Sequence, residues 1–560
     1  MKKTLTLVLS GQAGQGLMTL ESLLAEAIRK QYYLFTSPEF MSRVRGGNNS
    51  VELVIASEPV DAWRKGIDVL FVVGPESFER MESRLNENSL VISESKYIPE
   101  KERSKLNFIE FKLSELAKEA GSQLYGNTVA FGYIAALLGL DKKVCHKAIR
   151  SRFSKLKEDI VEKNISAFDL GHEKCRDIQL PVEIEKVKDK PAGKVMNGST
   201  AVSLGALAGG VNYVSSYPMS PSTGVLMYLA SKGKQFDVLV EQAEDEIAAL
   251  NMVIGAWYAG ARGLATTSGG GFALMCEALS LSGITETPCV IHLAQRPGPA
   301  TGLPTRTEQG DINLALYGGH GEFPRIILAP GHIKDAAILS QKAFWLADKY
   351  QVPVIILTDQ YILDSMSETE PFEFDESALE SFVIETKEDY LRYDLSNGPI
   401  SPRGIPGYGK GFVKADSDEH TEEGLITEDF DVRIAMNDKR LGKLSLILED
   451  YQDAELLGND DYERLFVGFG TTYGVLKEFV EEGDGRDAFL YIRQPYPLPE
   501  SLKAYFNKAR EVIVVENNAT GQMASLLKSE LGVGIDHQIL KYNGEPFSIE
   551  EIEKESGRLS

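Results

Sequence analysis

Residues 263–305, GLATTSGGGFALMCEALSLSGITETPCVIHLAQRPGPATGLPT, contain two short apolar runs that each end in a loop rich in glycine or proline. The runs cover 263–268 and 289–294, and a helical stretch fits between them. Four further apolar runs alternate with helical stretches on either side: 211–216, 238–241, 325–329 and 353–358. Such alternation predicts a parallel sheet with helices on both faces.

The alternation of strands and helices extends to both ends of the chain. An apolar run at 4–9, a glycine turn and a helix over 17–30 open the sequence. Three apolar runs close it: 464–469, 488–492 and 511–515. Charged segments with Pro or Gly at 178–193 and 395–425 are typical of a linker and an extended excursion. We therefore predict an α/β chain of three domains, each built on a doubly wound, mostly parallel sheet.

The composition excludes some classes of protein. The 560 residues include 59 Lys and Arg and 82 Asp and Glu, which gives a net charge of −23. This balance argues against nucleic-acid binding, because contacts with a phosphate backbone need a basic surface. The apolar stretch after Lys2 and Lys3 is too short for a signal peptide, and no apolar run approaches the ~20 residues that span a bilayer. We expect a cytoplasmic protein with no membrane segment.

The four cysteines are scattered along the chain: Cys145, Cys175, Cys276 and Cys289. Structural zinc and iron–sulfur clusters need clustered thiolates, and no two of these cysteines have C-x-x-C spacing. We expect neither kind of site in this chain. Sparse cysteine also fits a reducing compartment.

Gly11, Gly14 and Gly16 form a G-x-x-G-x-G turn between the first predicted strand and helix. Backbone N–H groups in such a turn can approach a phosphate at the helix N-terminus. The spacing differs from the G-x-G-x-x-G of dinucleotide sites, and no acidic residue completes a ribose site. An anion-binding turn and a tight turn without a ligand are equally good interpretations.

Three more polar segments follow predicted strands, where open α/β sheets bind their ligands. SYPMSPSTG (216–224) presents hydroxyls from a loop that two prolines stiffen, and EQAEDEIAA (241–249) gathers four carboxylates at a helix start. The loop after 289–294 holds Arg296 in a rigid frame that suits capture of a carboxylate or phosphate. Helix capping, a favourable helix dipole and a solvated surface arginine explain the same features without a ligand.

Five long motifs in the middle of the chain resemble the α subunit of 2-oxoacid:ferredoxin oxidoreductases. They are YPMSPST (217–223), EDEIAALNM (244–252), TSGGGFALM (267–275), QRPGPATGLPTRTEQGD (295–311) and LYGGHGEFPR (316–325). The region from Gly404, with Asp418-Glu419-His420 and Lys439-Arg440, and the closing VENNATGQ (515–522) are similar to that family too. The first 180 residues, with GQAGQG and Arg45-Gly46-Gly47, resemble the γ subunit fused in front.

The resemblance implies a division of the chain into three domains joined by two connecting segments. It comprises a Rossmann-like γ domain at 1–180, a linker at 181–193, a thiamine-pyrimidine-binding domain at 194–395, an extended excursion at 396–460 and a transketolase C-terminal-like domain at 461–560.

The resemblance also implies an enzyme of the EC 1.2.7 type that oxidatively decarboxylates a 2-oxoacid onto coenzyme A and reduces ferredoxin. Thiamine diphosphate is shared in this family: its pyrimidine end lies on the α subunit, whereas its diphosphate, the Mg²⁺ and an iron–sulfur cluster lie on a separate β subunit. The chain should hold no metal itself and be active only with the β subunit, in a dimer of heterodimers. The best guess for the substrate is 2-oxoglutarate, with pyruvate or a branched-chain 2-oxoacid as the alternative.

Residue roles follow from the same match. Glu246 corresponds to the catalytic glutamate that hydrogen-bonds the aminopyrimidine ring, and Arg296, also a catalytic candidate, holds the substrate carboxylate together with Thr305. Ser220 stands where the family has a threonine that contacts the substrate. The expected cofactor contacts are Tyr217, Pro218, Glu246, Ser268, Gly269 and Gly270, the last in place of a family proline. The expected coenzyme A contacts are Gly14, Gly16 and Arg45.

Two rival interpretations come from other classes of protein. The first is a transketolase-like thiamine enzyme without iron–sulfur chemistry, and the second is a scaffold or ligand-binding subunit without catalysis. Gly483-Asp484-Gly485 looks like a Mg²⁺–diphosphate motif, but it follows an acidic helix end rather than an apolar strand. We interpret it as a solvated turn, which argues against the first rival, and the presence of Glu246 and Arg296 argues against the second.

Overall fold

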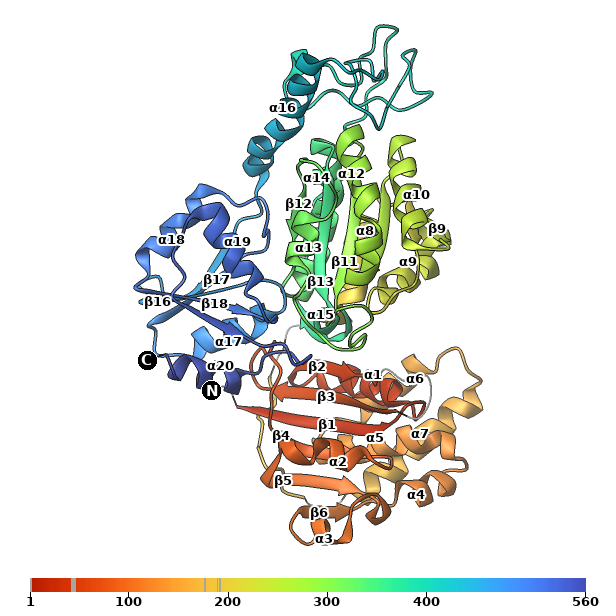
Figure 1. Cartoon of the computed structure of the whole chain (residues 1–560). Helices are drawn as coiled ribbons and strands as arrows, with labels where there is room; N and C mark the ends of the chain where they lie inside the picture. Colours follow the sequence, from red (N-terminus) through yellow and green to blue (C-terminus); the bar gives the residue numbers. More distant parts are fainter. Residues whose placement is uncertain (1–2, 42–46, 176–177, 189, 191–192, 560) are drawn as a thin grey trace. The chain divides into compact units, whose positions relative to one another are not determined.

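The computed structural model describes residues 3–41, 47–175, 178–188, 190 and 193–559. The chain forms two compact units (Figure 1). The first unit comprises Met1–Met196, Ser365–Pro371 and Ser548–Lys554; the second comprises Asn197–Asp364, Phe372–Phe547 and Glu555–Ser560. The boundaries of the three predicted domains remain a prediction.

The first unit is built on an eight-stranded sheet of mixed direction. Its strands lie in the order β6-β5-β4-β1-β3-β2-β14-β7. Their bounds are β1 Thr4–Gln12, β2 Tyr33–Glu39, β3 Asn48–Ala56, β4 Ile67–Val72, β5 Leu85–Ser93, β6 Asn107–Glu110, β7 Lys194–Asn197 and β14 Met366–Thr369. β1, β4, β5 and β6 are parallel, whereas β3 is antiparallel to β1 and to β2. β14 comes from far along the chain and lies antiparallel to β2.

Two helices of the first unit, α5 (Gly126–Leu137) and α7 (Glu158–Lys174), are in backbone contact. A Cβ atom on Gly132 would lie 2.0 Å from the carbonyl oxygen of Phe168, and one on Gly171 would lie 1.9 Å from that of Val129. Because neither backbone leaves room for a side chain, glycine is required at both crossing positions.

The second unit contains a fully parallel six-stranded sheet in the order β12-β13-β11-β10-β8-β9. Its strands are β8 Tyr213–Ser216, β9 Leu239–Gln242, β10 Gly263–Ser268, β11 Cys289–Gln295, β12 Ile326–Leu328 and β13 Pro353–Asp359. β10, β11 and β13 are buried along their whole length, as expected for a parallel sheet between helices. The helices around it include α8 (Gly198–Ala208), α9 (Thr223–Phe236), α10 (Glu246–Tyr258), α12 (Cys276–Thr285) and α14 (Ile333–Tyr350) (Figure 1).

The rest of the second unit consists of an excursion and a five-stranded sheet. The sheet has the order β15-β17-β16-β18-β19, and its strands are Glu455–Gly458, Arg464–Gly468, Asp487–Tyr491, Glu511–Glu516 and His537–Leu540 for β15 to β19. The excursion ends in a long helix, α16 (Phe430–Ile447), which the sequence analysis did not predict. Two buried lysines of α16, Lys439 and Lys443, bind the carboxylate of Glu286 at 2.7 and 2.6 Å.

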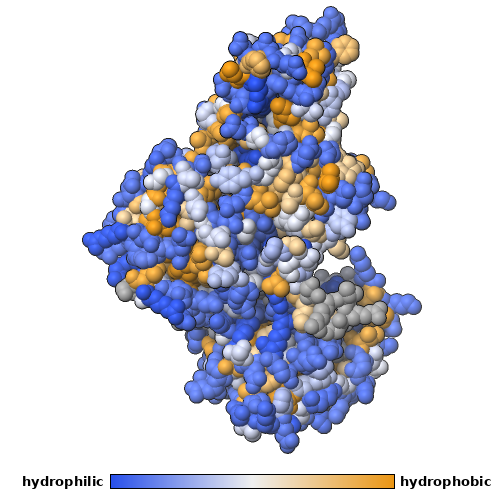
Figure 2. Space-filling view, viewed as in Figure 1, coloured by the Kyte–Doolittle hydropathy of each residue, from blue (hydrophilic) through white to orange (hydrophobic). Residues whose placement is uncertain are grey.

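The predicted α/β fold class of mostly parallel sheets is confirmed, and every predicted apolar run falls on a strand. The first sheet differs from the expectation in its antiparallel half, where β3 pairs with both β1 and β2. Among the described residues, no helix combines the length and apolar character needed to cross a bilayer. Figure 2 shows apolar side chains interspersed among hydrophilic ones on the face in view.

A buried histidine joins three neighbouring strands of the parallel sheet. His292 on β11 is fully buried; its Nδ1 lies 2.7 Å from Oγ1 of Thr266 on β10, and its Nε2 lies 2.8 Å from Oγ1 of Thr358 on β13. Burial lowers the pKa of His292 to about 3, so the imidazole is neutral at physiological pH. A neutral ring can donate one hydrogen bond and accept the other, which fits its two hydroxyl partners.

Gly132→Ala should destabilise the first unit. The added methyl group collides with the α7 backbone, and overpacking of this kind costs about 1–3 kcal/mol. Thermal unfolding of the first unit measures the loss. The matched control is Gly126→Ala at the start of the same helix, where the nearest atom to the added Cβ is 3.8 Å away. Equal unfolding temperatures for the two variants would contradict the tight crossing.

His292→Gln should make stability less dependent on pH. The folded state keeps His292 neutral, whereas the unfolded chain takes up a proton near pH 6.5, so stability falls as the pH drops below 6.5. Between pH 7 and 5 this one group accounts for about 2 kcal/mol of the unfolding free energy. Urea denaturation at both pH values should show that difference reduced in His292→Gln and unchanged in His320→Gln, whose side chain is exposed.

Candidate functional site

The loops that carry the predicted site residues leave the parallel sheet at one edge. β8, β10 and β11 are neighbours and parallel, so the segments after Ser216, Ser268 and Gln295 emerge together. α10 begins just after β9, the strand on the other side of β8. The structure thus brings together segments that lie far apart in the sequence, at the edge where open parallel sheets bind ligands. We call the region between these three loops and the start of α10 the crevice.

Glu246 is buried at the start of α10 with part of its carboxylate unpartnered. Its side chain is 3% exposed, and Oε1 forms no hydrogen bond with any described residue. Helix capping does not account for it, because Asp245 caps α10 by accepting a hydrogen bond from the N–H of Ala248 at 2.8 Å. A buried acceptor without a partner is costly, and such a group in a crevice points to a ligand donor.

The glycine loop at 269–271 makes room for that carboxylate. A Cβ on Gly271 would lie 2.7 Å from Glu246 Oε1 and 2.1 Å from Oγ1 of Thr267. Next to it, the hydroxyl of Ser268 is fully buried and unpartnered among the described residues. Gly270 is exposed, and the nearest atom to a Cβ there is 4.0 Å away, so the surroundings leave room for a Cβ at the position where the family has proline.

Arg296 lies at the same edge, directly after β11. Its Nη1 donates a hydrogen bond of 2.6 Å to the carbonyl oxygen of Ser220, which joins two of the predicted segments. Burial lowers the pKa of Arg296, and the nearby Asp311 opposes that shift. A guanidinium has five N–H donors, and the bond to Ser220 uses one of them, so Arg296 has hydrogen-bonding capacity left for an anion.

The remaining predicted residues surround this group with free polar atoms. Tyr217 is 40% exposed, Pro218 and Thr305 are half-buried, and Ser220 is exposed. In the part of the chain that the structure describes, the hydroxyls of Ser220 and Thr305 form no hydrogen bond. Both remain available to a ligand at the mouth of the crevice.

Asp311 is a site residue that the sequence analysis did not single out. Its carboxylate lies against the glycine loop, because a Cβ on Gly269 would be 2.4 Å from Asp311 Oδ2. That oxygen is buried and has no hydrogen-bond partner among the described residues. The residue closes the QRPGPATGLPTRTEQGD motif, so its place at the end of a conspicuous loop was the available signal.

The loop between Arg296 and Asp311 is clamped by the five-stranded sheet. The N–H of Gln309 donates to the carbonyl oxygen of Asn517 at 2.7 Å, and Oε1 of Gln309 accepts from the N–H of Asn517 at 3.0 Å. The carbonyl oxygen of Gln309 also accepts a hydrogen bond from Nδ2 of Asn518 at 3.2 Å. Gln522 Nε2 donates to the carbonyl oxygen of Gly310 at 2.8 Å. The motif VENNATGQ thus fixes the loop that carries the arginine.

The glycine turn at 11–16 lies in the first unit and is braced internally. Gln15 accepts a hydrogen bond from the N–H of Gln12 at 2.7 Å, and Gly14 and Gly16 have φ angles of 88° and 77°. A side chain at Gly16 would also meet the amide of Asn127. A cavity of about 220 Å³ adjoins the turn and is lined by Gln12, Gly14, Gly16, Leu17, Met18, Phe40, Asn49 and Val51. Arg45 lies outside the described residues.

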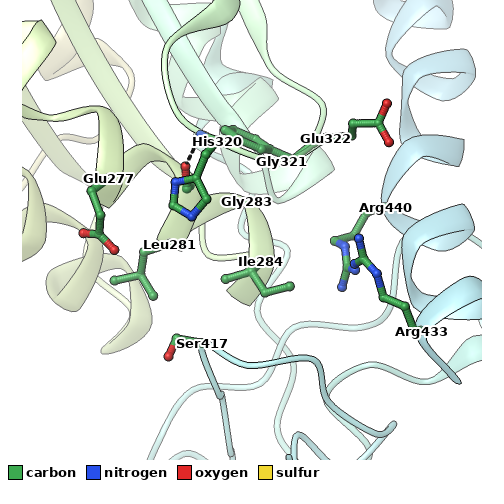
Figure 3. Close-up of a pocket in the computed structure, with 12 residues that line it drawn as sticks. Glu277, Leu281, Gly283, Ile284, His320, Gly321, Glu322, Ser417, Arg433 and Arg440 are labelled. Carbon is green, nitrogen blue, oxygen red and sulfur yellow. Dashed lines mark hydrogen bonds between the residues drawn. The ribbon is translucent and has the colours of Figure 1, made fainter. Parts of the chain in front are cut away.

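The segment LYGGHGEFPR lines a separate cavity of about 210 Å³ in the second unit (Figure 3). The cavity lies between α12, the loop around His320 and α16, and Arg433 and Arg440 reach its rim (Figure 3). Glu419 binds both arginines, at 2.6 Å to Arg433 and 2.8 Å to Arg440. One carboxylate thus pairs with two guanidinium groups, and these ion pairs join the segment around Glu419 to α16.

Family models match both parts of the chain. One described as "Pyruvate flavodoxin/ferredoxin oxidoreductase, thiamine diP-bdg" matches residues 204–439, which contain the whole crevice loop set. Another, described as "Pyruvate ferredoxin/flavodoxin oxidoreductase", matches residues 6–174. The resemblance that the sequence motifs indicated is thereby confirmed.

Full-length relatives and a solved structure agree. The 2-oxoacid:ferredoxin oxidoreductase subunit alpha of Sulfolobus sp is 31% identical over 98% of this chain and 96% of its own length. The 2-oxoglutarate oxidoreductase subunit KorA of Mycobacterium tuberculosis is 28% identical over 97% of this chain and 89% of its own. The structure of 2-oxoglutarate:ferredoxin oxidoreductase from Magnetococcus marinus, with 2-oxoglutarate, coenzyme A and succinyl-CoA bound, matches with a TM-score of 0.92, 28% identity and full coverage of both chains.

Proposed function

The chain belongs to the 2-oxoacid:ferredoxin oxidoreductase family as an α subunit, and we propose that it carries a fused γ domain and serves an enzyme that converts 2-oxoglutarate and coenzyme A to succinyl-CoA, CO₂ and reduced ferredoxin. The observation that carries the proposal is the buried carboxylate of Glu246, whose Oε1 has no partner among the described residues and lies against the glycine loop. That carboxylate occupies the position of the family's cofactor-binding glutamate.

The residues of the crevice fit the pyrimidine end of thiamine diphosphate. An aminopyrimidine ring offers hydrogen-bond donors and acceptors, and the crevice offers the unpartnered Glu246 Oε1 and Ser268 Oγ. We assign Tyr217, Pro218, Ser268, Gly269 and Gly270 to the walls around the ring. When bound, thiamine diphosphate supplies the carbanion chemistry that removes CO₂ from a 2-oxoacid.

Glu246 acts on a proton in this proposal. Its carboxyl group would share one proton with a pyrimidine ring nitrogen, donating while the carboxyl is protonated and accepting once the ring nitrogen carries the proton, which is the work of a positioned acid–base group. Because Oε1 is buried, a hydrogen bond to the ring would form in surroundings of low dielectric constant, which strengthens it.

Arg296, Ser220 and Thr305 form the proposed subsite for the substrate carboxylate. The guanidinium fork suits two carboxylate oxygens, and the two free hydroxyls can donate to the same group. Serine at position 220 keeps the hydroxyl of the family threonine but not its restricted rotamer, which leaves this contact more adaptable.

We place the Mg²⁺, the diphosphate and the iron–sulfur cluster on a β subunit, as the family resemblance implies. The GDG segment at 483–485 offers a poor metal site: Asp484 is 56% exposed, and Arg486 binds its carboxylate at 2.6 Å. The working enzyme in this proposal is a cytoplasmic dimer of α/γ–β heterodimers. Its β subunit closes the crevice and passes electrons to ferredoxin.

Coenzyme A is assigned to the first unit, near the glycine turn. The cavity beside Gly14 and Gly16 opens at the N-terminus of α1 (Leu17–Ile28), a position that favours anionic groups. Arg45 stays part of this proposal on the sequence match alone.

The choice of 2-oxoglutarate rests on two relatives. The similar full-length structure and the mycobacterial relative both bear the name of a 2-oxoglutarate enzyme. A substrate panel tests it: the complex reconstituted with its β subunit should reduce viologen with coenzyme A and 2-oxoglutarate faster than with pyruvate or a branched-chain 2-oxoacid. Faster turnover of pyruvate would assign the chain to the other branch of the family.

Glu246→Gln should lower the turnover of the reconstituted complex by about 10²–10⁴-fold, because one acid–base group is lost while shape and hydrogen-bonding capacity are kept. Viologen reduction at saturating thiamine diphosphate measures the effect. Glu244→Gln, at an exposed position two residues earlier, is the matched control and should keep wild-type turnover. Full activity in Glu246→Gln would remove Glu246 from the mechanism.

Arg296→Ala should raise the KM for the 2-oxoacid by at least about tenfold, because each charge-assisted hydrogen bond is worth roughly 1.5–3 kcal/mol. Arg296→Lys should recover only part of the affinity, since an ammonium group lacks the planar fork. Steady-state kinetics on the reconstituted complex measure the KM of both variants. An unaltered KM in both variants would mean that the substrate carboxylate binds elsewhere.

A further inference from the structure

Asp311 is rigidly held with its carboxylate turned towards the glycine loop. Its N–H donates to Oε1 of Gln295 at 3.0 Å, and Nε2 of Gln295 donates to the carbonyl oxygen of Thr358 at 3.2 Å. Although Asp311 precedes α13 (Ile312–Tyr317), its side chain does not cap that helix. Oδ2 is instead buried against Gly269 without a partner among the described residues.

The two charged groups near Asp311, Glu308 and Arg296, shift its pKa in opposite directions. The pKa of Asp311 is raised to about 6, mainly by burial and to a smaller extent by the carboxylate of Glu308, while Arg296 opposes this rise. The neighbouring groups from other elements are neutral. They are Gln295 of β11, the loop Ser268–Gly271, and Gln522 at the start of α19 (Gln522–Leu531), which binds the carbonyl oxygen of the preceding Gly310. A second carboxylate at this loop is that of Glu246, which lies against Gly271.

A substrate carboxylate bound to Arg296 would bring a second negative charge within electrostatic reach of Asp311, because Arg296 and Asp311 already influence each other's pKa. Two carboxylates that share one site cannot both stay ionised without a large cost, so one of them takes up a proton. The substrate carboxylate is held by the guanidinium, which favours its charged form. Asp311 is the group left to become neutral.

We propose that Asp311 is a positioning residue for the 2-oxoacid subsite, which takes up one proton when the substrate carboxylate binds Arg296 and releases it when that carboxylate leaves as CO₂. The inference rests on the proposed function. With Asp311 neutral, its Oδ2–H becomes a donor, and its charge no longer competes with the substrate carboxylate for the guanidinium of Arg296.

The proton balance is complete. The overall reaction is RCOCOO⁻ + CoASH → RCO–SCoA + CO₂ + H⁺ + 2 e⁻, with the two electrons passing to ferredoxin. The proton on Asp311 comes from solvent on binding and returns to solvent after the C–C bond to the carboxylate breaks. Asp311 is therefore unchanged over a full cycle, and its effect falls on KM rather than on the stoichiometry.

The test is the pH profile of KM for the reconstituted complex, with 2-oxoglutarate and pyruvate as probes and viologen as acceptor. Uptake of one proton raises KM by up to about tenfold per pH unit once Asp311 is ionised in the free enzyme. We expect the wild-type KM to rise at least about fivefold from pH 6 to pH 8. Asp311→Asn, which keeps the shape against Gly269, should have a KM that is flat over that range.

Glu308→Gln is the second test variant. It removes the neighbouring charge that raises the pKa of Asp311 and keeps the carboxylate of Asp311 in place. The pH at which KM begins to rise should move lower in this variant, a shift that a merely structural role would not produce. A flat wild-type profile, an unaltered slope in Asp311→Asn, or an unmoved profile in Glu308→Gln would each overturn the proposal. If Asp311→Asn fails to fold, Glu308→Gln alone decides. No turnover of any 2-oxoacid by the wild-type complex would instead overturn the proposed function.

Discussion

The constraint on which the site depends is the absence of side chains at Gly269 and Gly271. A Cβ on Gly271 would lie 2.7 Å from the Glu246 carboxylate, and a Cβ on Gly269 would lie 2.4 Å from that of Asp311. Any larger residue would push one of these acids out of the crevice. Two desolvated carboxylates can therefore both lie against the same short loop, and their unpartnered oxygens give the crevice its capacity for hydrogen-bond donors.

A second set of interactions holds the loops that approach this glycine turn. His292 joins β10, β11 and β13 just below the crevice, and it does so as a neutral ring because burial lowers its pKa. Gln309 and Asn517 fix the loop between Arg296 and Asp311 to the five-stranded sheet. The arginine is thus presented by a rigid frame, which is what the capture of a planar carboxylate requires.

The excursion is held by charge rather than by apolar packing alone. Glu286 is buried with Lys439 and Lys443, and Glu419 binds Arg440 from the excursion itself. Buried pairs of this kind add little net stability compared with apolar contacts, but they penalise any arrangement that separates the partners. They explain why the family motifs in this segment contain charged residues although they line no part of the crevice.

The sequence by itself determined the alternation of strands and helices, the glycine, proline and acidic segments at strand ends, and the family to which they belong. These features are local: the apolar period, the turn residues and the order of motifs can be read within a few tens of residues. It did not determine α16, in which three of the five buried residues are the charged Lys439, Arg440 and Lys443. Nor did it single out Asp311 among the acids of its loop or assign Asp245, rather than Glu246, to the helix cap. Only the tertiary structure decided these points, because burial and the loss of hydrogen-bond partners arise when β8, β10 and β11 bring distant loops to one edge of the sheet.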